Sequence, residues 1–111
     1  MALRTTVTLY EEEGLESDRV RDDYVSTAYT AFSTYRNTLG ASATKVEIDL
    51  GAVTTVQYLF ISTDTAIVVY IDTDVITITV GTFFLITGCS HTKLEVIAAS
   101  GAGIFVYAAG I

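Results

Sequence analysis

The chain has 111 residues, which is enough for one domain, and half of these residues are hydrophobic while only 17% are charged. Threonine, valine and isoleucine together account for 40 residues, and β-branched side chains favour strands over helices. This composition excludes a disordered chain and predicts an all-β fold. The net charge of −7 disfavours a nucleic-acid partner, because an acidic surface repels phosphate groups.

The N-terminal part of the chain divides into a strand and an acidic segment. Residues 5–10 alternate between apolar and polar, which predicts a strand with Val7 and Leu9 on one face. Residues 11–23 contain seven acidic side chains, and a run of like charges that cannot be buried is typical of a solvated loop or a mobile arm. We therefore expect residues 1–23 to form an N-terminal strand and acidic arm, and residues 24–111 to form the body.

Residues 24–36 (YVSTAYTAFSTYR) fit two kinds of element. Val25, Tyr29 and Phe32 recur at helical spacing. The high content of hydroxyl and aromatic side chains instead favours a strand. The strand is the preferred prediction, and the helix remains the alternative.

The rest of the body is predicted to consist of short strands about ten residues apart. We expect strands at residues 44–50, 53–62, 66–71, 75–80, 82–86, 93–98 and 104–108, with a tight turn at residues 72–74. In the first of these, Val46, Ile48 and Leu50 should face inward; residues 53–62 are apolar on both faces, as in a central strand. Seven strands, or eight with residues 24–36, predict an antiparallel β-sandwich or jelly roll.

The apolar stretch of residues 75–92 has to be considered as a membrane span, because it contains no formal charge when His91 is neutral. Its threonines alternate with isoleucine and valine, which indicates strands rather than a lipid-facing helix, so we expect no membrane partner. Residues 1–10 lack the apolar core of a signal peptide. The single cysteine, Cys89, cannot form an internal disulfide, in keeping with folding in a reducing cytosol.

Cys89 and His91 are the residues that could support nucleophilic catalysis, since positions two apart on a strand face the same side. A turn beside a strand that buries a small thiol is the preferred interpretation, and a small enzyme that uses this pair is an alternative. One histidine and one cysteine cannot supply the four ligands of a zinc site.

The acidic residues of the body do not form a recognisable site either. Asp64, Asp72 and Asp74 lack the loop spacing of a calcium site and fit turns. Paired carboxylates for glycoside hydrolysis would have to come from outward strand positions, where a solvated face explains them. These positions are Glu47, Asp49 and Glu95. We therefore expect a protein that is not an enzyme and that has no metal or cofactor.

Aromatic residues are densest at Tyr29, Phe32 and Tyr35. Packing in the core or at a subunit interface is preferred over a sugar-stacking surface, because aromatic side chains dominate both kinds of contact. Together with apolar positions of the first strand, they give the candidate interface residues Leu3, Val7, Leu9, Tyr29, Phe32 and Tyr35.

From residue 44 onward, the order of strands and turns resembles that of small virion proteins of tailed bacteriophages. The segments that carry the resemblance are KVEIDLGAVTTVQYLFISTD, AIVVYIDTDVITITV and FFLITGCSHTKLEVIAASGAGIFVYAAG. The pattern Leu-Gly followed by Val-x-x-Val-x-Tyr-Leu, and the closing Leu-Ile-Thr-Gly before two strands, are turn and strand motifs rather than catalytic signatures.

The resemblance implies a capsid decoration (cement) protein with a jelly-roll body that assembles as a homotrimer. Such a protein is made in the host cytoplasm, binds the major capsid protein on the capsid exterior and stabilises the lattice. The surplus of apolar residues agrees with this role, since a chain of this size buries only about 65% of its surface. A tail-fibre or baseplate domain that contacts a host receptor or glycan is the alternative.

Overall fold

The computed structural model describes residues 2–10 and 19–111, with the backbone alone for residues 2–10 and 19–28. Within these ranges the chain forms ten strands and no helix, which confirms the predicted all-β fold. The described residues therefore include no helix long and apolar enough to cross a membrane. Residues 76–80 and 83–91, within the apolar stretch 75–92, form two separate strands.

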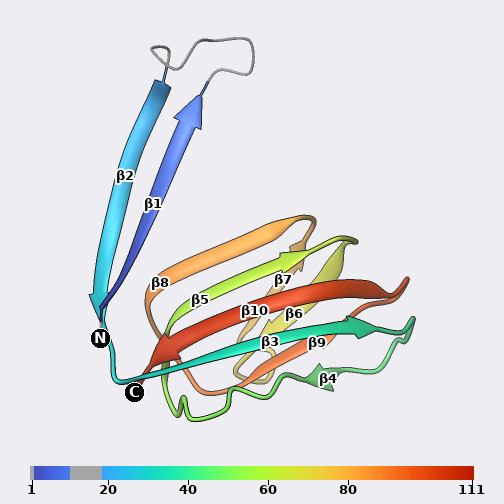
Figure 1. The fold of residues 1–111 in the computed structure, drawn as a ribbon. Helices are drawn as coiled ribbons and strands as arrows, with labels where there is room; N and C mark the ends of the chain where they lie inside the picture. Colours follow the sequence, from blue (N-terminus) through green and yellow to red (C-terminus); the bar gives the residue numbers. More distant parts are fainter. Residues whose placement is uncertain (1, 11–18) are drawn as a thin grey trace.

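The body is a sandwich of two antiparallel four-stranded sheets (Figure 1), as predicted. The first sheet has the order β3-β10-β5-β8, and the second has the order β4-β9-β6-β7. The bounds of the first sheet are β3 Ala31–Leu39, β10 Ala102–Gly110, β5 Val56–Thr63 and β8 Phe83–His91. Those of the second are β4 Val46–Glu47, β9 Leu94–Ile97, β6 Ile67–Ile71 and β7 Ile76–Val80.

The strand pairs of the body are nested along the chain. β3 pairs with β10, β4 with β9, β5 with β8 and β6 with β7, all antiparallel. The innermost hairpin turns at residues 72–74, where Asp72, Thr73 and Asp74 have φ values of 53°, 53° and 70°. Aspartate tolerates this left-handed region better than most residues, so the predicted turn is confirmed with a physical reason.

The main core lies between the two sheets and is aliphatic. Leu59 and Ile61 of β5 face Val69 of β6 and Val96 of β9, and each of these side chains is at most 2% exposed. The predicted inward residue Ile48 is 2% exposed, but Val46 remains 36% exposed. The predicted strand 44–50 is reduced to the two residues of β4, because β4 lies at a sheet edge and has a pairing partner on one side only.

The N-terminal strands form a separate two-stranded sheet, β1 Ala2–Tyr10 and β2 Arg19–Ala28, which projects from the sandwich (Figure 1). Residues 19–23, predicted as part of the acidic loop, belong to β2; that prediction was wrong for them. Their two arginines and two aspartates balance, so the repulsion expected of the acidic run does not oppose pairing. Residues 11–18 lie outside the described residues, and the predicted boundary at residues 23/24 falls inside β2.

Residues 24–36 are strand, as preferred from the sequence, but they belong to two strands. β2 ends at Ala28 and β3 begins at Ala31. The two intervening residues are held in place: Tyr29 is 5% exposed, and the Thr30 amide donates a 2.9 Å hydrogen bond to the Gly110 carbonyl. The end of the arm is therefore anchored beside the C-terminal strand.

Candidate interaction surface

The outer face of the β3-β10-β5-β8 sheet is covered with aromatic rings. Along β5 and β10, residues that face the core are mostly aliphatic, while those that face outward are mostly aromatic. The registers place outward positions of all four strands side by side. We call this surface the aromatic face and define it by Phe32, Tyr58, Phe60, Phe83, Phe105 and Tyr107.

The rings of the aromatic face form two sets of contacts, one around Tyr107 and one around Phe60. Tyr107 stacks on Phe32 at 6.3 Å between centroids and meets Tyr58 edge-on at 5.9 Å. Phe60 lies 6.4 Å from both Phe83 and Phe105. Offset-stacked and edge-to-face pairs at these separations each contribute about 0.5–1.5 kcal/mol beyond burial. The rings therefore hold one another in fixed positions.

Two rings at the edges of this surface are open to solvent. Phe32 on β3 is 50% exposed and Phe83 on β8 is 66% exposed. Since a phenylalanine buries about 200 Å² when enclosed, roughly 200 Å² of ring surface is exposed at these two positions. Covering it would contribute about 5 kcal/mol at about 25 cal/mol per Å². Exposed rings at both edges of one sheet face make this face a candidate interaction surface.

The outer face of the opposite sheet has a different composition. It presents Thr77 and Thr79 of β7 and, on the paired positions of β4 and β9, Glu47 and Glu95. Lys45 bonds the Asp74 carboxylate at 2.5 Å there and lies 4.3 Å from the centre of the Tyr70 ring. This face combines polar and charged side chains with the partly buried Val68, Tyr70 and Ile97, and it carries none of the exposed phenylalanines of the aromatic face. The asymmetry singles out the aromatic face as the candidate interaction surface.

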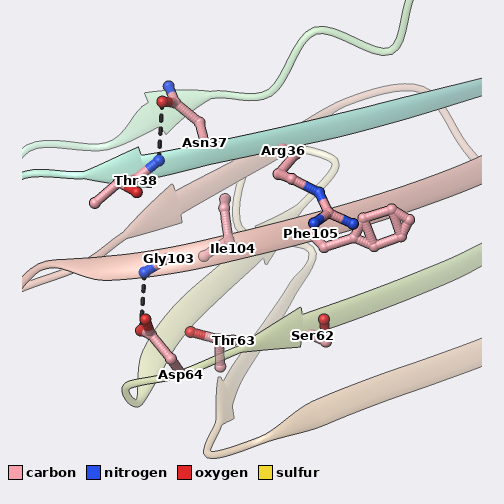
Figure 2. Close-up of a pocket in the computed structure, with 9 residues that line it drawn as sticks. All are labelled: Arg36, Asn37, Thr38, Ser62, Thr63, Asp64, Gly103, Ile104 and Phe105. Carbon is pink, nitrogen blue, oxygen red and sulfur yellow. Dashed lines mark hydrogen bonds between the residues drawn. The ribbon is translucent and has the colours of Figure 1, made fainter.

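Arg36 is the charged residue of the aromatic face. Its guanidinium carbon lies 5.0 Å from the centre of the Phe105 ring on the neighbouring strand, as Figure 2 shows. Such cation–π contacts contribute about 0.5–1 kcal/mol at exposed sites. Among the described residues, no carboxylate pairs with Arg36. An exposed cation at this position is available to an acidic partner.

An open groove of about 710 Å³ lies at one end of the aromatic face, across β3, β10 and β5. Asp64 closes its floor by accepting a 2.8 Å hydrogen bond from the Gly103 amide, which Figure 2 shows at the end of β5. A side chain at position 103 would come within 2.8 Å of that carboxylate, so the Asp64 side chain would have to shift to accommodate it. The polar and aromatic side chains that line the groove are Arg36, Asn37, Thr38, Ser62, Asp64 and Phe105.

The predicted cluster of Tyr29, Phe32 and Tyr35 is divided between two faces. Phe32 lies on the aromatic face, and Tyr29 packs against Tyr58 and Ala109 on the same side of the sheet. The Tyr29 and Tyr107 hydroxyl oxygens lie 3.0 Å apart, and burial together with this hydrogen bond raises the pKa of Tyr29 to about 12. Tyr35 instead packs against the main core.

The other candidate interface residues lie in the arm. Leu3, Val7 and Leu9 occupy alternate positions of β1, so the backbone places them on the same face of the hairpin. Whether they contact another subunit remains a prediction.

Cys89 and His91 lie at the end of β8, and Asp72 is the partner that the sequence did not reveal. The Asp72 carboxylate contacts His91 Nδ1 at 2.7 Å and accepts hydrogen bonds from the Thr92 and Lys93 amides at 2.8 and 3.2 Å. These amide bonds, with the His91 bond, lower the pKa of Asp72. The arrangement ties the β6–β7 turn to the opposite sheet.

The Cys89 thiol is not activated by this cluster. Its sulfur donates a 3.5 Å hydrogen bond to the Val56 carbonyl, and burial raises the pKa of Cys89 above its ordinary value. A raised pKa lowers the population of thiolate, which is the reactive form. The geometry therefore favours a structural role for this end of β8.

The three aspartates considered for calcium do not converge. Asp72 bonds His91, Asp74 pairs with Lys45, and Asp64 binds the Gly103 amide. In the part of the chain that the structure describes, no group of three or more histidine, cysteine or acidic side chains is placed to hold a metal ion. Glu47 and Glu95 lie directly opposite each other on β4 and β9, on the charged outer face.

Comparisons with known proteins do not assign the chain to a family. No family model, no curated protein and no solved structure matched it.

Most residues of the aromatic face were missed from the sequence. The signal was present in the alternation within β5 and β10, where aromatic and aliphatic positions occupy alternate places. Phe105 and Tyr107 alternate with Ile104 and Val106, for example. Because neighbouring strand positions point to opposite faces, this pattern predicts one aliphatic and one aromatic face.

Proposed function

We propose that this chain is a structural protein of a tailed-phage virion, a capsid decoration protein that binds the outer capsid lattice and stabilises it as a homotrimer. The observation that carries the proposal is the exposed aromatic face, with Phe32 50% and Phe83 66% exposed. A decoration protein works by burying surface between neighbouring subunits, and this face supplies such surface. The resemblance of residues 44–111 to phage virion proteins supports the same role.

The strand order gives further support. Nested antiparallel pairs that fold over into two four-stranded sheets are expected of a jelly roll, a fold used by viral capsid proteins and lectins. The projecting β1–β2 arm suits a protein that reaches a neighbour. In this proposal the major capsid protein is the partner, and the sandwich is a scaffold that needs no chemistry of its own.

The number of copies per virion tests the proposal. Virions of the phage that encodes the chain would be purified and the chain quantified against the major capsid protein by mass spectrometry with labelled peptides. We expect hundreds of copies. A count between six and eighteen would instead indicate a tail location, and absence from the particle would exclude both.

Attachment through the arm is tested by deletion. Removing residues 2–28 takes away the whole hairpin, whereas a cut at residue 23 would leave half of β2 without its partner. We expect the truncated body to fold and its occupancy on capsids to fall. Unchanged occupancy would exclude a role of the arm in attachment.

A tail-fibre or baseplate domain that binds a host glycan is the second candidate. The observation in its favour is the groove beside the aromatic face, where polar groups of Asn37, Ser62 and Asp64 lie near the Phe105 ring. Polar groups beside an aromatic surface are what a sugar site requires. Binding to a glycan array that Asp64→Ala removes would favour this candidate.

A further inference from the structure

The β1–β2 arm is a two-stranded sheet that lacks a third strand. β1 and β2 pair with each other over nine and ten residues and with no other described strand. Figure 1 shows the hairpin extending away from both sheets of the body. The radius of gyration, 15.3 Å, exceeds the value of about 13 Å expected for a compact domain of this length. An isolated hairpin is marginally stable in water, so an arm of this length needs a surface to lie on.

The register separates the arm into an apolar and a polar face. Leu3, Val7 and Leu9 share one face with Val25, which lies opposite Thr5. The same face also holds Thr5, Thr27, Asp23 and Arg21. The opposite face carries Arg4, Thr6, Thr8, Asp22, Tyr24 and Ser26, so the face with Leu3, Val7, Leu9 and Val25 is the more apolar of the two. The apolar face of the arm is therefore the one that requires cover.

We propose that the apolar face of the arm covers the aromatic face of a second copy of this chain. This inference rests on the self-association that is part of the proposed function. Every copy carries both surfaces, so two or three copies can exchange arms and bury both surfaces at once.

The arm does not reach the aromatic face of its own chain. Only Tyr29 and Thr30 connect β2 to β3, and both are fixed: Tyr29 by burial and its bond to the Tyr107 hydroxyl, Thr30 by its bond to Gly110. These bonds set the direction in which the arm leaves the body. To fold back over β3, the chain would have to reverse within two anchored residues.

The dimensions of the two surfaces agree. Strands of nine residues are roughly 30 Å long, which holds for β1 as for β3 and β10. A two-stranded arm is about 10 Å wide, so it covers roughly 300 Å². In a reciprocal dimer, where each copy engages both its arm and its aromatic face, each copy buries about 600 Å², or roughly 1,200 Å² in total, above the threshold of about 1,000 Å² for a specific interface. In a ring of three copies, each of the three contacts buries about 600 Å².

The charges are also complementary. Arg36 on the aromatic face has no carboxylate partner among the described residues. Asp23 lies on the apolar face of the arm, directly opposite Val7. Arg21 shares that face two positions nearer the arm's tip, so Asp23 is the charge nearest the middle of the apolar face. A carboxylate brought against Arg36 would satisfy a cation that the isolated chain leaves with only the Phe105 ring.

Disulfide trapping between separately prepared variants tests the inference. In a Cys89→Ser background, one protein carries Val7→Cys and the other Thr34→Cys, an exposed position on β3 between Phe32 and Arg36. A disulfide between them can form only between two chains. One matched control is Thr8→Cys, on the opposite face of the arm. The other is Thr79→Cys, on the outer face of the β4-β9-β6-β7 sheet.

We expect the Val7–Thr34 mixture to crosslink at least five times faster than either control mixture. Light scattering of the unmodified chain should give the mass of an oligomer, and deletion of residues 2–28 should give a monomer. A monomeric full-length chain, or equal crosslinking by Val7 and Thr8, would overturn the inference. So would a double variant on one chain that crosslinks within itself.

Capsid occupancy is a separate readout. A chain that is monomeric in solution but occupies capsids would exclude arm exchange and leave the decoration role standing. A chain that exchanges arms but is absent from virions would exclude the decoration role and leave arm exchange standing.

Discussion

The two faces of the β3-β10-β5-β8 sheet should respond to substitution in opposite ways. Ile61 faces the main core and is 0% exposed, whereas Phe83, on the adjacent strand β8, is 66% exposed on the aromatic face. Replacing Ile61 by alanine removes three carbon atoms, a loss of roughly 2.4 kcal/mol in transfer free energy. The unfilled cavity brings the loss of unfolding free energy to about 3–4 kcal/mol.

Urea denaturation measures this difference. With an m-value of about 1.75 kcal/mol per molar, the midpoint for Ile61→Ala should fall by roughly 2 M. The measurement belongs at a protein concentration low enough to keep the chain dissociated, since association adds to apparent stability. Phe83→Ala should cost about 1 kcal/mol or less, because most of its ring is already in water.

Light scattering at high concentration gives the complementary result. We expect Phe83→Ala to weaken self-association by at least tenfold and Ile61→Ala to leave it unchanged while the chain is folded. The reasoning fails if Phe83→Ala destabilises the dissociated chain as much as Ile61→Ala does. The aromatic face would then be a second core that the chain covers by itself.

Three further substitutions or probes test individual contacts. Gly110→Ala places a side-chain carbon against the Thr55 carbonyl and should lower the free energy of unfolding by about 1–3 kcal/mol, measured by thermal unfolding. The control Gly40→Ala, whose added carbon meets no other atom, should leave stability unchanged. Equal effects of the two substitutions would contradict the close approach at Gly110. The pKa of Asp72 is lowered in the folded chain, so its contribution to the free energy of unfolding is present above about pH 4 and is lost as the pH falls through the folded pKa. Asp72→Asn should therefore lower the free energy of unfolding by about 1–2 kcal/mol at pH 7. A loss of the same size at pH 2 would refute the assignment. Burial raises the pKa of Cys89, so iodoacetamide at pH 7.5 should label it more slowly in the folded chain than in urea; rapid labelling of the folded chain would reopen a catalytic role.

Most strands of the body could be placed from the sequence, although several of their bounds were wrong, and the site could be predicted only in part. The turn-forming tendency of aspartate located the turn at residues 72–74. Periodicity located the core position of Ile48, because side-chain direction alternates along a strand. The length of β8 and the short β4 were not predictable in this way, because strand ends depend on which neighbours are present to pair. Asp72 and His91 are nineteen positions apart, and no local pattern joins them.

The sequence by itself determined the class of fold, the approximate placement of most strands and the alternation of aliphatic with aromatic positions in β5 and β10. These properties follow from local preferences of β-branched residues and from the two-residue period of the backbone. Only the tertiary structure decided which strands lie side by side, and therefore that aromatic rings from four separate segments meet on one outer face. Pairing between segments far apart in the chain depends on the packing of the whole domain, which no short stretch of sequence contains.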